Sequence, residues 1–154
     1  MRALVAVIAW VGVLGLGASR PPDEWVLLSG TLAKELTSQC SRPAPADYDD
    51  TWDPAVSDIA RLEEHLKELE KLTTSSCCLP GARIGDVHSY RRQYVGLVLK
   101  GRKIIYINAF RRSATESEWR RKPVLYCDGG ESFWGATFDP ASGTFSDLAF
   151  NGVA

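Results

Sequence analysis

Residues 89–110 read SYRRQYVGLVLKGRKIIYINAF and predict a β-hairpin. Apolar and β-branched side chains dominate residues 89–99 and 102–110, and Lys100-Gly101 between them forms a tight turn in which glycine supplies a positive φ. With a two-residue turn, alternate side chains of the two strands share a face, and apolar residues lie on both faces. Both faces of the predicted sheet are therefore expected to be covered.

Further strands are expected after the hairpin. Residues 123–127, 132–138 and 144–150 are strand-like, and the last two are separated by DPASG, a typical turn composition. Gly135 inside the middle strand is expected to leave room for a ring from a neighbouring strand or for a bend. The pattern predicts an antiparallel meander of four to five strands.

Helices are expected before the hairpin. One amphipathic helix is predicted at about 53–74, with Asp53 as its N-cap and Pro54 at its first position. Its apolar side chains recur at helical steps: Val56, Ile59, Leu62, Leu66, Leu69 and Leu72. A shorter helix is expected within residues 23–39. Helices followed by an antiparallel sheet define an α+β fold, with the long helix packed across one face.

The chain of 154 residues is expected to hold a leader and a single domain. In residues 1–19, Arg2 is followed by an apolar run and then by small residues, which is the pattern of a secretory signal peptide. The apolar run is too short to span a membrane. Residues 20–52 form an N-terminal segment with a Pro- and Asp-rich connector, and residues 53–154 hold the helix and sheet. We therefore predict a secreted or periplasmic protein without an integral membrane segment after cleavage, whose source organism and exact cleavage site stay open.

Four cysteines follow the leader: Cys40, Cys77, Cys78 and Cys127. An even number of cysteines in an exported chain predicts disulfide bonds. Consecutive Cα atoms lie only about 3.8 Å apart, below the usual disulfide range, which disfavours a bond between Cys77 and Cys78. Cys40 is thus expected to pair with one of these two and Cys127 with the other, in either combination. The chain has no CxxC motif and no histidine at ligand spacing, so no metal site and no cofactor are expected.

The formal net charge of -1 gives no global basic field, and no nucleic-acid partner is expected. The charges are nevertheless unevenly distributed, because residues 20–78 carry 12 acidic and 6 basic side chains and residues 79–154 carry 7 and 11. The candidate partner-binding residues are Arg111, Arg112, Trp119, Arg120, Arg121 and Lys122. They predict an acidic protein or glycan partner. The alternative is that these cations only add solubility or pair with the acidic helix.

His88 and Asp86 are the candidate catalytic residues, as a histidine with a nearby carboxylate. Near neighbours on an extended segment point to alternate faces, so catalysis would require that the fold bring an acid to the His88 ring inside a concave pocket. Whether the protein is an enzyme stays open, and a non-enzymatic role is favoured.

Two resemblances add to this interpretation. A helix, an antiparallel sheet, disulfides and export resemble the cystatin architecture. Cystatins carry Gln-x-Val-x-Gly in a hairpin loop, whereas residues 93–96 read QYVG within a predicted strand, so the resemblance implies a fold and no inhibitory site. The C-terminal half resembles a group of exported bacterial proteins of unassigned function, through CDGG at 127–130, FWG at 133–135, FDP at 138–140 and FNG at 150–152.

The leading hypothesis is a small, monomeric, exported binding or inhibitor-like module. A small secreted hydrolase using His88 and a structural envelope component are the alternatives.

Overall fold

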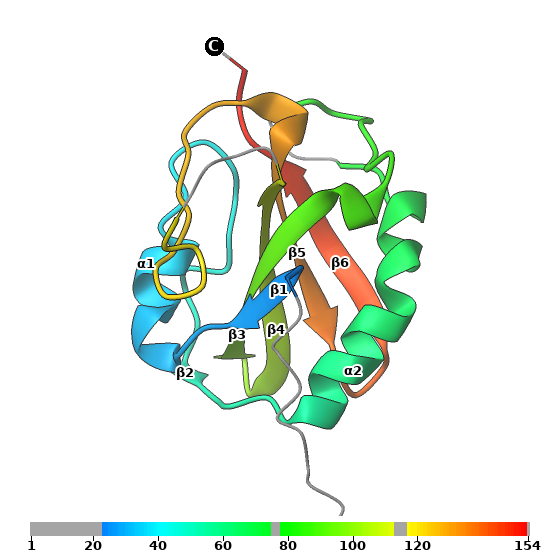
Figure 1. The fold of residues 1–154 in the computed structure, drawn as a ribbon. Coiled ribbons are helices and arrows are strands. Elements are labelled where there is room, and N and C mark those ends of the chain that lie inside the picture. The colour runs from blue at the N-terminus through cyan, green and yellow to red at the C-terminus, as the bar shows by residue number, and fades with distance from the viewer. Residues whose placement is uncertain (1–22, 75–77, 113–116, 154) are drawn as a thin grey trace, which may run out of the picture.

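The structure, a computed structural model, describes residues 23–74, 78–112 and 117–153. The described residues form an α+β fold with two α-helices and a mixed sheet of six strands, in the order β1-β3-β4-β5-β6 with β2 also paired to β3 (Figure 1). The predicted signal peptide, residues 1–19, lies outside this part. None of the helices in the described ranges is long and apolar enough to cross a membrane.

The central hairpin is confirmed. Strands β3 (Tyr90–Leu99) and β4 (Arg102–Arg111) pair antiparallel with Leu99 opposite Arg102, which is the expected register. Lys100 and Gly101 both have positive φ, at 51° and 74°, as a two-residue turn of the primed type requires. Local sequence therefore specified both the turn and the face on which each side chain lies.

Strands β5 (Phe133–Asp139) and β6 (Thr144–Phe150) continue the meander as expected. The predicted strand at 123–127 is wrong. Strand β5 occupies the second edge of β4, so residues 123–127 cannot pair with β4. Side-chain amides bind this segment instead, since Val124 N–H donates to Gln93 Oε1 at 2.9 Å and its carbonyl accepts from Asn108 Nδ2 at 2.8 Å.

The N-terminal segment makes the sheet mixed rather than a pure meander. Strand β1 (Trp25–Leu27) runs parallel to the first half of β3, and β2 (Asp50–Thr51) pairs antiparallel with its second half. The expected helix at 23–39 is therefore reduced to a 3₁₀ turn, η1 (Gly30–Leu32), and α1 (Ala33–Thr37). The open edge of β3 accounts for the difference, because it offers β1 ladder hydrogen bonds that a helix could not use.

The long helix is shorter than predicted. Helix α2 (Val56–His65) continues as a 3₁₀ helix, η2 (Leu66–Lys71). Its N-cap is Ala55 rather than Asp53, and the Asp58 carboxylate accepts a hydrogen bond from the Ala55 N–H at 2.8 Å. The cap therefore comes from a carboxylate inside the first turn.

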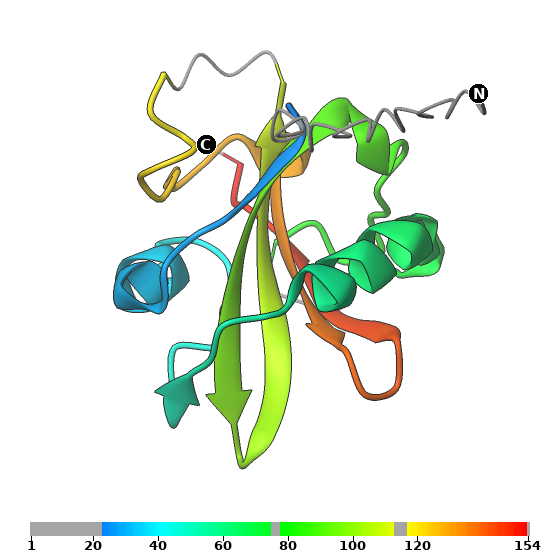
Figure 2. The same ribbon diagram turned by 60° about the horizontal axis from the view of Figure 1, so that its bottom comes forward.

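The two helices cover opposite faces of the sheet, as Figure 2 shows in a nearly edge-on view. Ile59, Leu62 and Leu66 pack on the α2 face against strand residues that include Tyr94, Ile107, Trp134 and Phe150. The α1 face buries a second cluster, which includes Ala33, Leu36, Val95, Leu97, Ile104 and Tyr106. The expectation that both faces are covered is confirmed.

A buried ion pair ties α2 to the sheet. The Arg92 side chain of β3 is fully buried, and its Nη2 lies 3.1 Å from Glu63 Oε2 on α2. Arg92 Nε also donates to Tyr94 Oη at 2.9 Å, and Tyr94 Oη donates to Glu63. Burial of Tyr94 raises its pKa well above the ordinary value for tyrosine.

The disulfide bond contradicts the expected pairing. Cys40 is bonded to Cys127, at a Cα–Cα distance of 5.1 Å, and neither is bonded to Cys77 or Cys78. The expected pairing required Cys40 and Cys127 both to lie beside the corner after the helix, whereas Cys40 lies beside the loop that precedes β5. Cys77 lies outside the described residues, and Cys78 donates from its Sγ to the Ser41 carbonyl at 3.0 Å.

Candidate binding surfaces

The predicted partner-binding residues gather at one end of the sheet. Arg112 Nη2 lies 2.8 Å from Glu24 Oε1, and Arg120 Nη2 lies 2.9 Å from Asp23 Oδ1. Because Asp23 and Glu24 are consecutive, they bring the two arginine-rich loops together at the start of β1. We define this basic end by six cations: Arg91, Arg111, Arg112, Arg120, Arg121 and Lys122.

Aromatic rings hold several of these arginines in place. Trp119 is only 6% exposed and packs edge-on against Phe110 at 5.9 Å between ring centroids. The guanidinium carbons of Arg91 and Arg120 lie 5.3 Å and 4.5 Å from its ring. These are cation–π distances, so Trp119 acts as a buried support for the cations that flank it. Arg111 is placed similarly, 4.6 Å from the Tyr90 ring.

Carboxylates neutralise part of this basic end. Glu118 pairs with Lys122 and lies 3.5 Å from Arg121. A hydrogen bond from Lys122 lowers the pKa of Glu118, and one from Arg112 lowers the pKa of Glu24, so both carboxylates stay ionised at neutral pH. Among the described residues, the ion pairs of these cations go to Asp23 and Glu24 of the acidic N-terminal segment and to Glu118, and none goes to helix α2.

A buried glutamine fixes the loop that carries half of the basic end. Gln93, fully buried on the α1 face, donates through Nε2 to the carbonyls of Trp119 at 2.5 Å and Lys122 at 2.6 Å. Its Oε1 accepts from Val124 N–H and from Asn108 Nδ2 at 2.9 Å each. The sequence pattern does not reveal this role of Gln93, although a Gln and an Asn within a buried hairpin indicate that polar groups must be hydrogen-bonded there.

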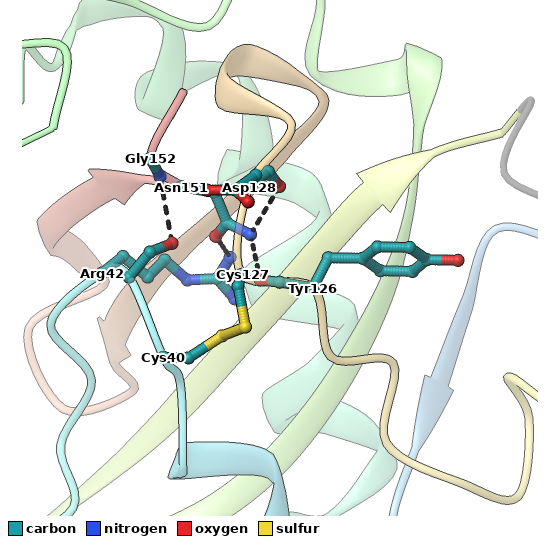
Figure 3. The surroundings of a disulfide bond; sticks show 8 residues. Cys40, Arg42, Tyr126, Cys127, Asp128, Asn151 and Gly152 are labelled. Carbon is teal, nitrogen blue, oxygen red and sulfur yellow. Dashed lines mark hydrogen bonds between the residues drawn. A yellow bond between two sulfur atoms is a disulfide. The ribbon is translucent and has the colours of Figure 1, made fainter. Parts of the chain in front are cut away.

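Arg42 joins the same row of polar side chains from the connector. It is 4% exposed, and it donates through Nη2 to Asn108 Oδ1 and through Nη1 to Asn151 Oδ1. Asn151 in turn donates to the carbonyls of Tyr126 and Asp128 beside the Cys40–Cys127 disulfide (Figure 3). No carboxylate of the described residues forms an ion pair with Arg42.

Gly135 makes room for this arrangement. A Cβ at Gly135 would lie 2.8 Å from Tyr106 Oη and 3.0 Å from Arg42 Nε, so any other residue would collide with both. The prediction that Gly135 admits a ring from a neighbouring strand is thus confirmed, with Tyr106 of β4 as that ring. Neither Tyr106 Oη nor Arg42 Nε has a hydrogen-bond partner among the described residues, although both are buried.

The structure does not bring His88 and Asp86 together as an acid–base pair. Asp86 Oδ1 accepts from the His88 backbone N–H at 3.0 Å and so caps the short 3₁₀ turn η3 (Val87–Ser89). His88 is exposed, and it lines neither the cavity beside Leu99 and Ala149 nor the one beside Trp52 and Lys103. The described residues also contain no cluster of His, Cys, Asp or Glu that could hold a metal ion.

Comparison with known proteins adds no relative: no family model, no curated protein and no solved structure matches this chain. Two features of the described surface are distinct, namely the basic end and a cavity of about 400 Å³ on the α1 face that Leu99, Asp147 and Ala149 line.

Proposed function

We propose that the protein is a small, non-enzymatic, exported binding module whose basic end docks onto a carboxylate-rich protein surface. The observation that carries the proposal is the convergence of the two arginine-rich loops on Asp23 and Glu24. The Cys40–Cys127 disulfide supports export, since disulfides persist in oxidising compartments.

The kind of cation favours carboxylates as the partner groups. Five of the six cations of the basic end are arginines, whose planar guanidinium matches a carboxylate through two parallel hydrogen bonds. Arg91, Arg111 and Arg120 lie against aromatic rings, so little side-chain freedom is lost when a partner binds. Arg121 and Lys122 are the most open to contact, with 79% and 69% of their side chains exposed.

The test is binding of the purified mature chain to a decaglutamate peptide, measured by fluorescence anisotropy at 50 and 200 mM salt. We expect Arg121→Ala/Lys122→Ala to weaken binding about tenfold at low salt, because two of the contacting charges are lost. The matched control is Lys34→Ala/Lys67→Ala, which removes the same charge from exposed positions on α1 and η2 and should leave the affinity unchanged.

Two outcomes would contradict the proposal. If both double variants lose affinity equally, the peptide responds to net charge and not to the basic end. If heparin binds the wild type and decaglutamate does not, the partner is a sulphated glycan instead of a protein.

A further inference from the structure

Residues 122–126 lie over the α1 face of the sheet as an extended segment that is hydrogen-bonded along one side. Its alternate carbonyl groups accept hydrogen bonds from side-chain amides: Lys122 from Gln93 at 2.6 Å, Val124 from Asn108 at 2.8 Å, and Tyr126 from Asn151. Figure 3 shows the last of these bonds beside the disulfide. In an extended chain, successive residues direct their backbone groups to opposite sides. The N–H and C=O of Leu125 therefore point away from the row of amides.

The backbone of Leu125 is open to pairing. Leu125 is 38% exposed, and neither its N–H nor its C=O forms a hydrogen bond with any described residue. Buried backbone groups are almost always hydrogen-bonded, so an unpaired N–H and C=O on an exposed residue are solvated. An N–H and a C=O on the same side of an extended segment are what the edge of a β-sheet offers to another strand.

The side chains of this segment divide between the core and the solvent. Val124 is 5% exposed and packs with Phe110 and Trp119. Residues at odd positions take the other side of an extended chain. Leu125 is exposed there, and Arg121, just before the segment, has 79% of its side chain exposed. The open edge thus has a cation at its beginning and an apolar side chain near its end.

Charge decides which kind of segment pairs with this edge. Arg121 and Lys122 share one carboxylate of the described residues, Glu118, so a positive charge remains at the start of the edge. A strand with acidic side chains neutralises that charge, whereas a basic strand is repelled.

We propose that the protein binds an extended, acidic segment of its partner protein as an added strand along residues 122–126. The N–H and C=O of Leu125 pair with the backbone of that segment, and its carboxylates pair with Arg121 and Lys122. The inference rests on the proposed function, because it assigns the backbone conformation of the partner at the basic end.

The test uses the acetylated and amidated heptapeptide EEETVTV, whose glutamates match the cations and whose Thr and Val residues favour a strand. Hydrogen exchange of the ¹⁵N-labelled mature chain is followed by NMR with and without saturating peptide. We expect exchange of the Leu125 amide to slow at least tenfold, because its N–H becomes hydrogen-bonded. The Val124 amide is the internal control, since it already donates to Gln93 Oε1 at 2.9 Å, and its rate should change less than twofold.

Variants separate backbone pairing from charge attraction. Leu125→Pro removes the N–H donor, which makes no hydrogen bond within the described fold, and a residue before proline favours the extended conformation that Val124 already has. Leu125→Ala is the matched control, because it loses the same side chain and keeps the donor. We expect Leu125→Pro to bind EEETVTV at least tenfold more weakly than Leu125→Ala in fluorescence anisotropy, with equal urea midpoints. Arg121→Ala/Lys122→Ala should weaken binding of the same peptide about tenfold.

The inference is overturned, and the proposed function retained, if either peptide binds at the basic end while the Leu125 amide exchanges as fast as before, because docking then uses side chains alone. If neither EEETVTV nor decaglutamate binds, both fail. The exchange measurement decides by itself if Leu125→Pro does not fold.

Two further outcomes would assign the edge to a different occupant. If the Leu125 amide is protected but Arg121→Ala/Lys122→Ala binds like the wild type, the acidic partner is overturned. A wild-type dimer in sedimentation velocity that Leu125→Pro converts to a monomer would assign the edge to a second copy of this chain.

Discussion

Two buried arginines face opposite sides of the sheet, and they are stabilised in different ways. Arg92 on the α2 face meets the Glu63 carboxylate, so its charge is compensated. Arg42 on the α1 face donates to the amide oxygens of Asn108 and Asn151, which carry no charge. The first arginine joins a helix to a strand through an ion pair. The second gathers loops through hydrogen bonds while its charge has no counter-ion among the described residues.

The difference shows how each face is assembled. Helix α2 is regular and supplies a carboxylate at a defined helical position, which suits an ion pair. The α1 face is covered mainly by loops, whose backbone carbonyl and N–H groups must still be hydrogen-bonded. Arg42, Asn108 and Asn151 meet that need, and the Cys40–Cys127 bond holds the two loops that they join.

The largest effect is expected from removing the compensating charge. Glu63→Gln leaves the Arg92 cation buried without a counter-ion, which should lower the free energy of unfolding by about 3 kcal/mol. Urea unfolding followed by circular dichroism measures it. Glu64→Gln is the matched control at the next, exposed position and should change stability by less than about 0.5 kcal/mol. Equal effects of the two variants would mean that the Arg92–Glu63 pair contributes nothing.

A smaller effect is expected on the other face. Arg42→Met removes hydrogen bonds to two buried amide oxygens but also removes a buried charge that lacks a counter-ion, so the two changes partly offset each other. We expect a loss of about 2 kcal/mol by the same urea measurement, below that of Glu63→Gln. A loss larger than that of Glu63→Gln would reverse the comparison and make Arg42 the more important of the two cations.

The smallest effect is expected at Tyr94, and it depends on pH. Because its pKa is raised by burial, Tyr94 stays protonated above pH 10 in the folded state, whereas an unfolded tyrosine ionises there. The unfolded state then binds fewer protons, so this contribution to stability is complete below pH 10 and is lost as the pH rises further.

Tyr94→Phe removes that dependence together with the hydroxyl's hydrogen bonds to Arg92 and Glu63. The variant should be less stable than the wild type by about 1 kcal/mol at pH 8, and the gap should narrow between pH 9 and 11. Urea midpoints across this range measure it. A gap that stays constant would show that Tyr94 titrates alike in both states.

The candidate sites were predictable only in part. The cations of the basic end stand out in the sequence because arginine-rich clusters are local features. The sequence does not predict that these clusters converge, because the convergence depends on Asp23 and Glu24, about ninety residues away along the chain. The cavity on the α1 face could not be foreseen either, because its lining residues Tyr106, Thr137 and Asp147 come from three strands and are brought together by the pairing of β4, β5 and β6 and by the register shift between β5 and β6.

The amino-acid pattern alone was sufficient for the β3–β4 hairpin, for the apolar face of α2 and for the expectation of covered sheet faces. Each follows from side-chain periodicity and turn chemistry over a few residues. The parallel β1 strand, the side-chain binding of residues 123–127 and the Cys40–Cys127 bond depended on which distant segments compete for the same edge or surface. That competition is settled by packing and hydrogen-bond satisfaction over the whole molecule, which no local window of sequence contains.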